Sequence, residues 1–173
     1  MNTHIQNNLI EMVKDKLLLE RITLNGVDVN RRDSEGKNAL FWAIKKRTTH
    51  NANLLISFGS ELMVADGQHA LFHALESGHH EILVILIERG EDINSVDNAG
   101  KTLLMVAIEM EAFESVKYLV THGADVYKLD NALQMAEDYA KASNSELIQS
   151  YIQHVVYTDM QTTSDNNTLA KCG

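Results

Sequence analysis

The chain contains a single cysteine, Cys172, so no disulfide can form within it. This scarcity of cysteine fits a reducing compartment. No apolar run approaches the roughly 20 residues that a bilayer-spanning helix requires. The N-terminus also lacks the basic segment followed by an apolar stretch that is typical of a signal peptide. These absences predict a soluble, cytoplasmic protein with no membrane contact.

Basic charge is also scarce. The net charge is −9 at pH 7, whereas nucleic-acid binding requires a basic surface, so we expect no nucleic-acid partner. The charge is unevenly distributed along the chain. Residues 1–63 carry nine Lys and Arg against seven Asp and Glu, while residues 64–173 carry six against seventeen. We therefore expect an electrically polarised molecule whose cations gather in its N-terminal part.

The motifs of common catalytic centres are missing from the chain. It has no Gly-x-Ser-x-Gly elbow, no phosphate-binding glycine loop and no dinucleotide fingerprint. His80-Glu81 begins like the zinc-protease motif His-Glu-x-x-His, but Val84 stands where the second histidine is required. We expect no enzyme activity, no catalytic residue and no cofactor.

Glycine, in contrast, recurs regularly. Helix-ending glycines lie about 33 residues apart, at Gly26, Gly59, Gly90 and Gly123. Each begins a similar phrase, such as Gly26-Val-Asp-Val-Asn30. A second series lies 23 residues before three of these glycines, at Gly36, Gly67 and Gly100. Such a period predicts a stack of structural repeats.

Residues 97–129 show what one repeat contains. Asp97-Asn-Ala-Gly100 predicts a tight turn. Apolar residues at helical spacing then predict two short helices, of which the second ends at Gly123. Across the repeats, the first helices align at Leu40, Leu71, Leu104 and Leu133, and small residues align at Ala43, Ala74, Ala107 and Ala136. Helices this short cannot bury their apolar faces alone, so the repeats must stack.

These residues resemble the ankyrin repeat. The stretches Asp97-Asn-Ala-Gly-Lys-Thr102 and Gly123-Ala-Asp-Val126 match the pattern of that family, and Gly78-His79 matches the loop between its two helices. The resemblance implies an all-α solenoid of stacked helix-turn-helix units, joined by projecting β-hairpin-like turns. The chain has no proline, and its first helices begin with sequences such as Asn38-Ala-Leu-Phe41 instead of Thr-Pro-Leu-His. We expect apolar volume to replace the Thr–His hydrogen bonds of the family.

The repeats divide the chain into segments. We predict a single ankyrin-repeat domain over residues 1–155, followed by a polar, disordered tail over 156–173. Within the domain we expect an N-terminal capping repeat, three full repeats and a C-terminal capping repeat with a shortened connector, at 1–32, 33–63, 64–96, 97–129 and 130–155. The inward positions of the N-terminal cap are expected to be Leu9, Ile10, Val13, Leu18, Leu19 and Ile22.

The resemblance also implies where a partner binds, because partners of ankyrin-like stacks contact the projecting turns and the outward side of the first helices. In this chain that surface comprises Arg31, Arg32, Ser34, Glu35, Lys37, Lys45, Lys46, Gln68, Glu76, Ser77, Asn98, Lys101, Glu109 and Met110. We expect a monomeric, non-enzymatic module that binds another protein as its inhibitor or regulator. The cations of the first repeat predict an acidic patch on that partner.

Two further features have more than one interpretation. Trp42 is the single tryptophan, and its position predicts a core residue, whereas Met110 occupies an exposed position suited to a binding contact. Four histidines in one repeat offer an alternative function, a metal-binding or enzymatic protein that uses His69, His73, His79 and His80. The i, i+4 spacing of the first two suits a metal, but no cysteine or carboxylate at comparable spacing completes the ligand set.

The repeat pattern makes one prediction about stability. Replacing Ala107 with a bulky residue should split the stack near its middle and cost roughly 1–3 kcal/mol through overpacking. Equilibrium unfolding measures this cost, and an unchanged midpoint with retained cooperativity would contradict the repeat alignment.

Overall fold

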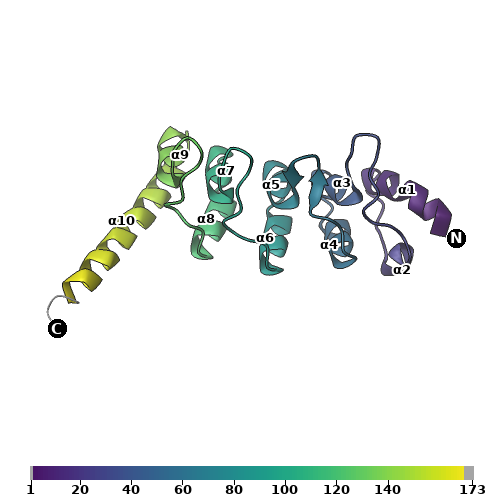
Figure 1. Cartoon of the computed structure of the whole chain (residues 1–173), viewed down its shortest axis with the longest axis horizontal. Helices are drawn as coiled ribbons and strands as arrows, with labels where there is room; N and C mark the ends of the chain where they lie inside the picture. The colour runs from purple at the N-terminus through teal and green to yellow at the C-terminus, as the bar shows by residue number, and fades with distance from the viewer. Residues whose placement is uncertain (1, 170–173) are drawn as a thin grey trace. The chain divides into compact units, whose positions relative to one another are not determined.

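The computed structural model describes residues 2–169, in which helices are joined by turns and the strands form one short hairpin (Figure 1). The chain forms two compact units, divided in sequence between Asp92 and Ile93. The first unit contains α1 (Asn2–Lys14), α2 (Arg21–Leu24), α3 (Ala39–Lys45), α4 (Thr49–Ser57), β1 (Met63–Ala65), β2 (Gln68–His69), α5 (Ala70–Glu76) and α6 (His80–Glu88). The second unit contains α7 (Leu103–Glu109), α8 (Phe113–Thr121), α9 (Ala136–Ala142) and α10 (Glu146–Leu169).

Each unit consists of two layers of helices. In the first unit, α1, α3 and α5 pack side by side in one layer, and α4 packs against α6 in the other. In the second unit, α7 packs against α9, and α8 packs against α10. Within each repeat the first helix contacts the second, as α3 contacts α4 (Figure 1). The prediction of stacked helix-turn-helix units is confirmed, while a single domain over residues 1–155 stays a prediction.

Small residues on the first helices permit this close packing. Ala43, Ala74 and Ala107 are completely buried, as the alignment predicts. The fourth member of the series is Ala140 and not Ala136. Helix α9 begins only at Ala136, so Ala140 lies as far from the start of its helix as Ala43 does from the start of α3.

The predicted alignment of Leu133 with the helical leucines is therefore wrong. Leu133 is 76% exposed and has a φ of 61°, close to the 73° of Gly36 and the 77° of Gly100. It lies in the connecting turn, at the position that these glycines occupy in earlier repeats. The last connector is thus of full length, and the apolar side chain of Leu133 concealed it in the sequence.

Aspartate side chains organise three of the connecting turns in the same way. Asp33 Oδ1 accepts hydrogen bonds from the backbone N–H groups of Glu35 (2.9 Å) and Lys37 (3.0 Å). Asp97 and Asp130 each accept the same pair of bonds, two and four residues further along. An aspartate that binds its own backbone in this way stabilises a turn. The connector at Gly67 is two residues shorter, and there β1 pairs with β2 as an antiparallel hairpin.

The first helices of the three full repeats, α3, α5 and α7, begin where the sequence predicts. The side chains of Asn38 and Thr102 accept hydrogen bonds from the backbone N–H groups three residues ahead, at 2.9 and 3.2 Å. His69 Nδ1 accepts a bond from the backbone N–H of Leu71 at 3.2 Å. Each side chain satisfies a helix N–H that has no partner within the helix. A different residue type thus caps the first helix in each of these repeats.

The N-terminal repeat follows its predicted pattern only in part. Leu9, Val13 and Leu19 are buried, but Leu18 is 69% exposed, which contradicts its inward assignment. The reason is local. The chain between α1 and α2 is not helical, and the buried side chain of Asn51 binds it by accepting from the Leu19 N–H (2.9 Å) and donating to the Leu17 carbonyl (2.8 Å). The side chain of Ile22 lies outside the described residues.

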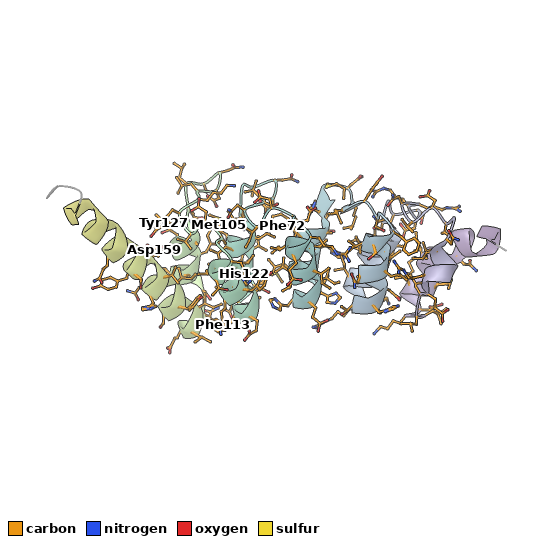
Figure 2. All side chains as sticks on the ribbon, turned by 90° about the horizontal axis from the view of Figure 1, so that it is seen from below. Phe72, Met105, Phe113, His122, Tyr127 and Asp159 are labelled. Carbon is orange, nitrogen blue, oxygen red and sulfur yellow. The ribbon has the colours of Figure 1, made fainter. Side chains whose placement is uncertain are left out.

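Helix α10 continues beyond the predicted domain boundary. Ile148, Ile152 and Val156 are buried along one side of it. Phe113 of α8, which is labelled in Figure 2, meets the ring of Tyr151 edge to face, with 5.6 Å between the ring centres. The helix then runs on to Leu169, where the sequence predicted a disordered tail from residue 156. No glycine or proline interrupts residues 157–169, although their apolar pattern ends. Residues 170–173, which include Cys172, lie outside the described residues.

The position of Leu133 gives a stability prediction. Leu133→Gly should raise the free energy of unfolding by about 0.5–1 kcal/mol, because glycine adopts a positive φ without the steric cost that a Cβ brings. Little burial is lost, since Leu133 is exposed. Chemical denaturation measures the difference. As a control, Gly100→Ala should destabilise the protein, since its Cβ would lie 2.6 Å from Asn131 Oδ1. A destabilised Leu133→Gly variant would disprove the equivalence of the two turns.

Candidate partner-binding surface

The exposed surface of the first full repeat, residues 33–63, which we call the first repeat, is arranged around Trp42. The indole Nε1 donates a hydrogen bond to Asp33 Oδ2 at 2.8 Å, and the ring meets Phe41 edge to face at 5.3 Å. Trp42 is therefore half-buried at the surface, and the prediction of a core residue is wrong. The indole N–H requires a hydrogen-bond partner, and the connecting turn provides one. Burial acts to raise the pKa of Asp33, but its bonds from Lys37, Trp42 and Glu35 outweigh this effect and lower it.

Three lysines gather over these rings. The ammonium nitrogens of Lys14, Lys37 and Lys45 lie 4.6, 5.1 and 5.3 Å from the centre of the Trp42 ring. Lys37 and Lys45 also lie over Phe41, at 4.8 and 5.7 Å. These distances are within the range of cation–π attraction. We call Lys14, Lys37 and Lys45, with the Phe41 and Trp42 rings, the lysine cluster.

Two members of the lysine cluster pair with nearby carboxylates. Lys14 Nζ lies 2.9 Å from Glu11 and 3.7 Å from Asp33, and its bond to Glu11 raises the pKa of Lys14. Lys37 Nζ lies 2.6 Å from Glu35. For Lys45, no carboxylate of the described residues lies within ion-pair distance, and its contacts are with the two rings.

The equivalent positions in the next repeats are paired internally. In the second repeat, Gln68 Nε2 donates to Glu76 at 2.7 Å, from the connector to the end of the first helix. In the third, Lys101 Nζ lies 2.9 Å from Glu109 at the same two positions. The first repeat carries lysine at both positions, Lys37 and Lys45, so this pair cannot form. The first repeat therefore carries two positive charges at these positions, whereas the pair is negative in the second repeat and neutral in the third.

Lys14 was absent from the predicted surface. It belongs to the same series of positions, two residues before the positive-φ residue that links the two helices of a repeat. That linking residue is Lys16 in the N-terminal repeat and Arg47 in the first full repeat. When Lys16 is aligned with Arg47, Lys14 falls at the position equivalent to Lys45. The irregular N-terminal repeat obscured this equivalence in the sequence.

The remaining predicted residues fall into two groups. Arg32 is held by the fold, because its guanidinium binds the carbonyls of Gly36 and Met63 and the carboxylate of Glu61. Met110 is 42% exposed, as its position predicts. Exposed or half-buried side chains are also found at Arg31, Ser34, Glu35, Lys46, Gln68, Glu76, Ser77, Asn98, Lys101 and Glu109. Their role in binding stays a prediction.

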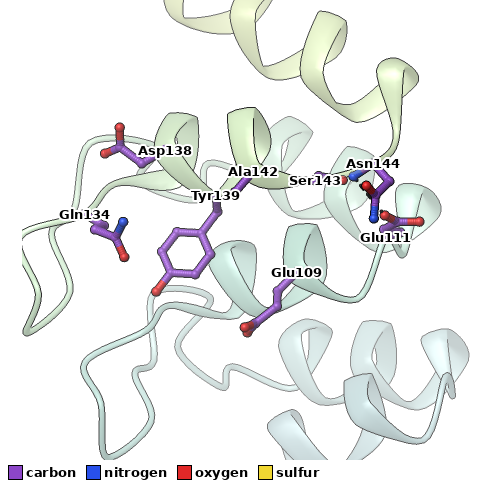
Figure 3. Close-up of a pocket in the computed structure, with 8 residues that line it drawn as sticks. All are labelled: Glu109, Glu111, Gln134, Asp138, Tyr139, Ala142, Ser143 and Asn144. Carbon is purple, nitrogen blue, oxygen red and sulfur yellow. Dashed lines mark hydrogen bonds between the residues drawn. The ribbon is translucent and has the colours of Figure 1, made fainter.

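The second unit has an open pocket of about 280 Å³ (Figure 3). It is lined by Glu109, Glu111, Gln134, Asp138, Tyr139, Ala142, Ser143 and Asn144. Its polar groups are largely engaged within the unit. Tyr139 donates to Asp130 at 2.6 Å, and Glu111 accepts from the backbone N–H of Asn144 at 3.1 Å. Burial, and then the bond to Asp130, raise the pKa of Tyr139, so the phenol stays protonated. The hydrogen bond from Tyr139 to Asp130 is thus the counterpart of the bond from Trp42 to Asp33, with a different aromatic donor.

The structure does not bring the four predicted histidines together. His69 Nδ1 starts helix α5, His73 Nε2 bonds to the Phe41 carbonyl at 3.1 Å, and His79 Nε2 lies 3.1 Å from the Thr49 hydroxyl. Burial lowers the pKa of all three, so these imidazoles are neutral at pH 7. Among residues 2–169, no group of three His, Cys, Asp or Glu residues is arranged to hold a metal ion.

Two layers of short helices with exposed connecting turns define a solenoid of helix-turn-helix repeats. Residues 52–130 match the family model for ankyrin repeats, in three copies. The resemblance to ankyrin repeats is thus confirmed over these residues, and ankyrin repeats are generally modules that bind other proteins. None of the helices in the described part of the chain is long and apolar enough to cross a bilayer.

Three relatives show how far the similarity reaches. An ankyrin repeat protein of Acanthamoeba polyphaga mimivirus is 27% identical over 163 residues, which cover 86% of this chain and 21% of the relative. The potassium channel AKT1 of Arabidopsis thaliana is 25% identical, with coverage of 83% and 21%. The ankyrin repeat domain-containing protein SAT10 of Stachybotrys chartarum is 32% identical, with coverage of 62% and 6%. The chain therefore spans about a fifth or less of each relative.

The buried histidines predict that stability depends on pH. An unfolded histidine titrates near pH 6.5, and a lowered folded pKa means that protons favour the unfolded chain below this value. Stability should therefore fall as the pH drops below about 6.5. His73→Gln keeps a donor for the Phe41 carbonyl and should reduce this dependence, measured as the free energy of unfolding at each pH. The variant His154→Gln, at an exposed position, should keep the full dependence, and an unchanged slope in His73→Gln would be inconsistent with the assignment.

Proposed function

We propose that this chain is a non-enzymatic module that binds a protein partner through its connecting turns and the exposed positions of its first helices. One observation carries the proposal. Positions that stabilise a repeat have the same residue in other repeats: the counterparts of Asp33 accept the same turn bonds, and those of Ala43 are likewise buried. Positions on the exposed side differ from repeat to repeat. The residue that directly follows the first helix is Lys46, Ser77 or Met110.

A protein partner suits this arrangement because the contact residues are already in place. The turns are held by aspartate bonds and the helices by buried packing, so little conformational entropy is lost when the partner binds. A module without chemistry of its own alters a partner by covering its surface, which is how an inhibitor or regulator acts. We propose that the chain does so as a monomer and that the partner presents an acidic patch to the first repeat.

Capture of the partner by the whole, immobilised chain tests this function. The variant Lys46→Glu/Met110→Glu reverses one charge and adds another on the proposed surface, and it should weaken partner binding at least tenfold. The matched control is Lys117→Glu/Leu147→Glu, at an exposed lysine of α8 and a 58% exposed leucine of α10. This control should bind like the wild type. If both folded variants keep the partner equally well, the binding surface lies elsewhere.

A further inference from the structure

The lysine cluster concentrates positive charge at a defined place. Three ammonium groups lie within 5.3 Å of the centre of one ring, although like charges repel. The electron-rich faces of Trp42 and Phe41 offset part of that repulsion. The bond from Trp42 to Asp33 in turn fixes the indole against the connecting turn. The fold therefore holds these cations in place before any partner arrives.

We propose that the lysine cluster receives a carboxylate from an acidic segment of the partner protein. The inference rests on the proposed function and names the chemistry of the partner at one site. Lys45 makes the first contact, because it is exposed and its described contacts are with the rings alone. Lys14 and Lys37 contribute when each exchanges the carboxylate of its present partner for the incoming one. Their partners Glu11 and Glu35 have side chains that are 63% and 60% exposed, and exposed ion pairs are weak.

The neighbouring repeats show which group the cluster lacks. Glu76 and Glu109 occupy the position of Lys45, and each places a carboxylate against the connector residue of its own repeat. In the first repeat the connector donor Lys37 is present, but the carboxylate opposite it is replaced by Lys45. A carboxylate supplied by the partner would take the place that Glu76 and Glu109 fill from within the chain. It would meet two ammonium groups instead of one donor.

An acidic protein segment fits the cluster better than a nucleic acid or a free phosphate. A phosphate backbone requires an extended basic surface, whereas the carboxylates of Glu11, Asp33 and Glu35 limit the positive charge here to a small area. Arginine forks favour phosphate, but the guanidinium of Arg32 is bound by two carbonyls and Glu61. The small size of the cluster suits one or two carboxylates.

Trp42 provides a probe inside the site, since it is the single tryptophan of the chain. Titration of the whole protein with a synthetic oligoglutamate peptide should change the Trp42 emission in a saturable way, and added salt should weaken the binding. An oligoglutamine peptide of the same length should have no effect. Lys45→Gln should weaken oligoglutamate binding at least about fivefold, and Lys45→Arg should retain it. Lys117→Gln removes the same charge at an exposed position of α8, outside the proposed binding surface, and should bind like the wild type.

Several results would overturn the inference. The first is the absence of both an emission change and a calorimetric signal with oligoglutamate. The second is an equal loss of affinity in Lys45→Gln and Lys117→Gln. The third is tighter binding of a short DNA duplex or inorganic phosphate than of oligoglutamate at the same salt. A captured partner that stays bound to Lys45→Gln but is lost from Lys46→Glu/Met110→Glu would refute this inference while the proposed function stands.

Discussion

The hydrogen bonds that aspartate accepts in the connecting turns are the interaction on which the exposed surface depends. One oxygen of Asp33 holds the turn by accepting two backbone N–H groups, and the other accepts the indole N–H of Trp42. The same carboxylate thus fixes both the backbone of the connector and an aromatic ring on the first helix. Asp130 does the same with Tyr139. Because the turn and the helix are joined in this way, side chains from both contribute to one rigid surface.

On this surface, small differences between repeats have large electrostatic consequences. The connector residue and the end of the first helix face each other in every full repeat, and their charges decide whether they pair. Lys101 and Glu109 neutralise each other, whereas Lys37 and Lys45 cannot. The same aspartate bonds hold the turn in both repeats, so the turn does not depend on this charge difference. It is therefore free to serve recognition, and this separation of scaffold from surface is what a binding module requires.

Much of the fold was predictable because the repeats constrain one another. The helix starts at Asn38, His69 and Thr102 and the buried alanines follow directly from the alignment. The errors arose where one residue departs from the pattern. Leu133 looks helical but adopts the turn conformation of a glycine, since Asp130 organises the turn whatever residue occupies that position. Leu18 is apolar but exposed, because the backbone on either side of Leu19 is bound by Asn51.

The sequence by itself determined the class of fold, the period of the repeats and the cationic character of the first one, since these depend on the order of residues along the chain. It could not determine that Trp42 lies at the surface with three lysines around it. That arrangement needs the Asp33 carboxylate, nine residues before Trp42, and Lys14, from a different helix. Only the tertiary structure decided it, because distances between side chains from separate elements are set by how the helices pack and not by their spacing in the sequence.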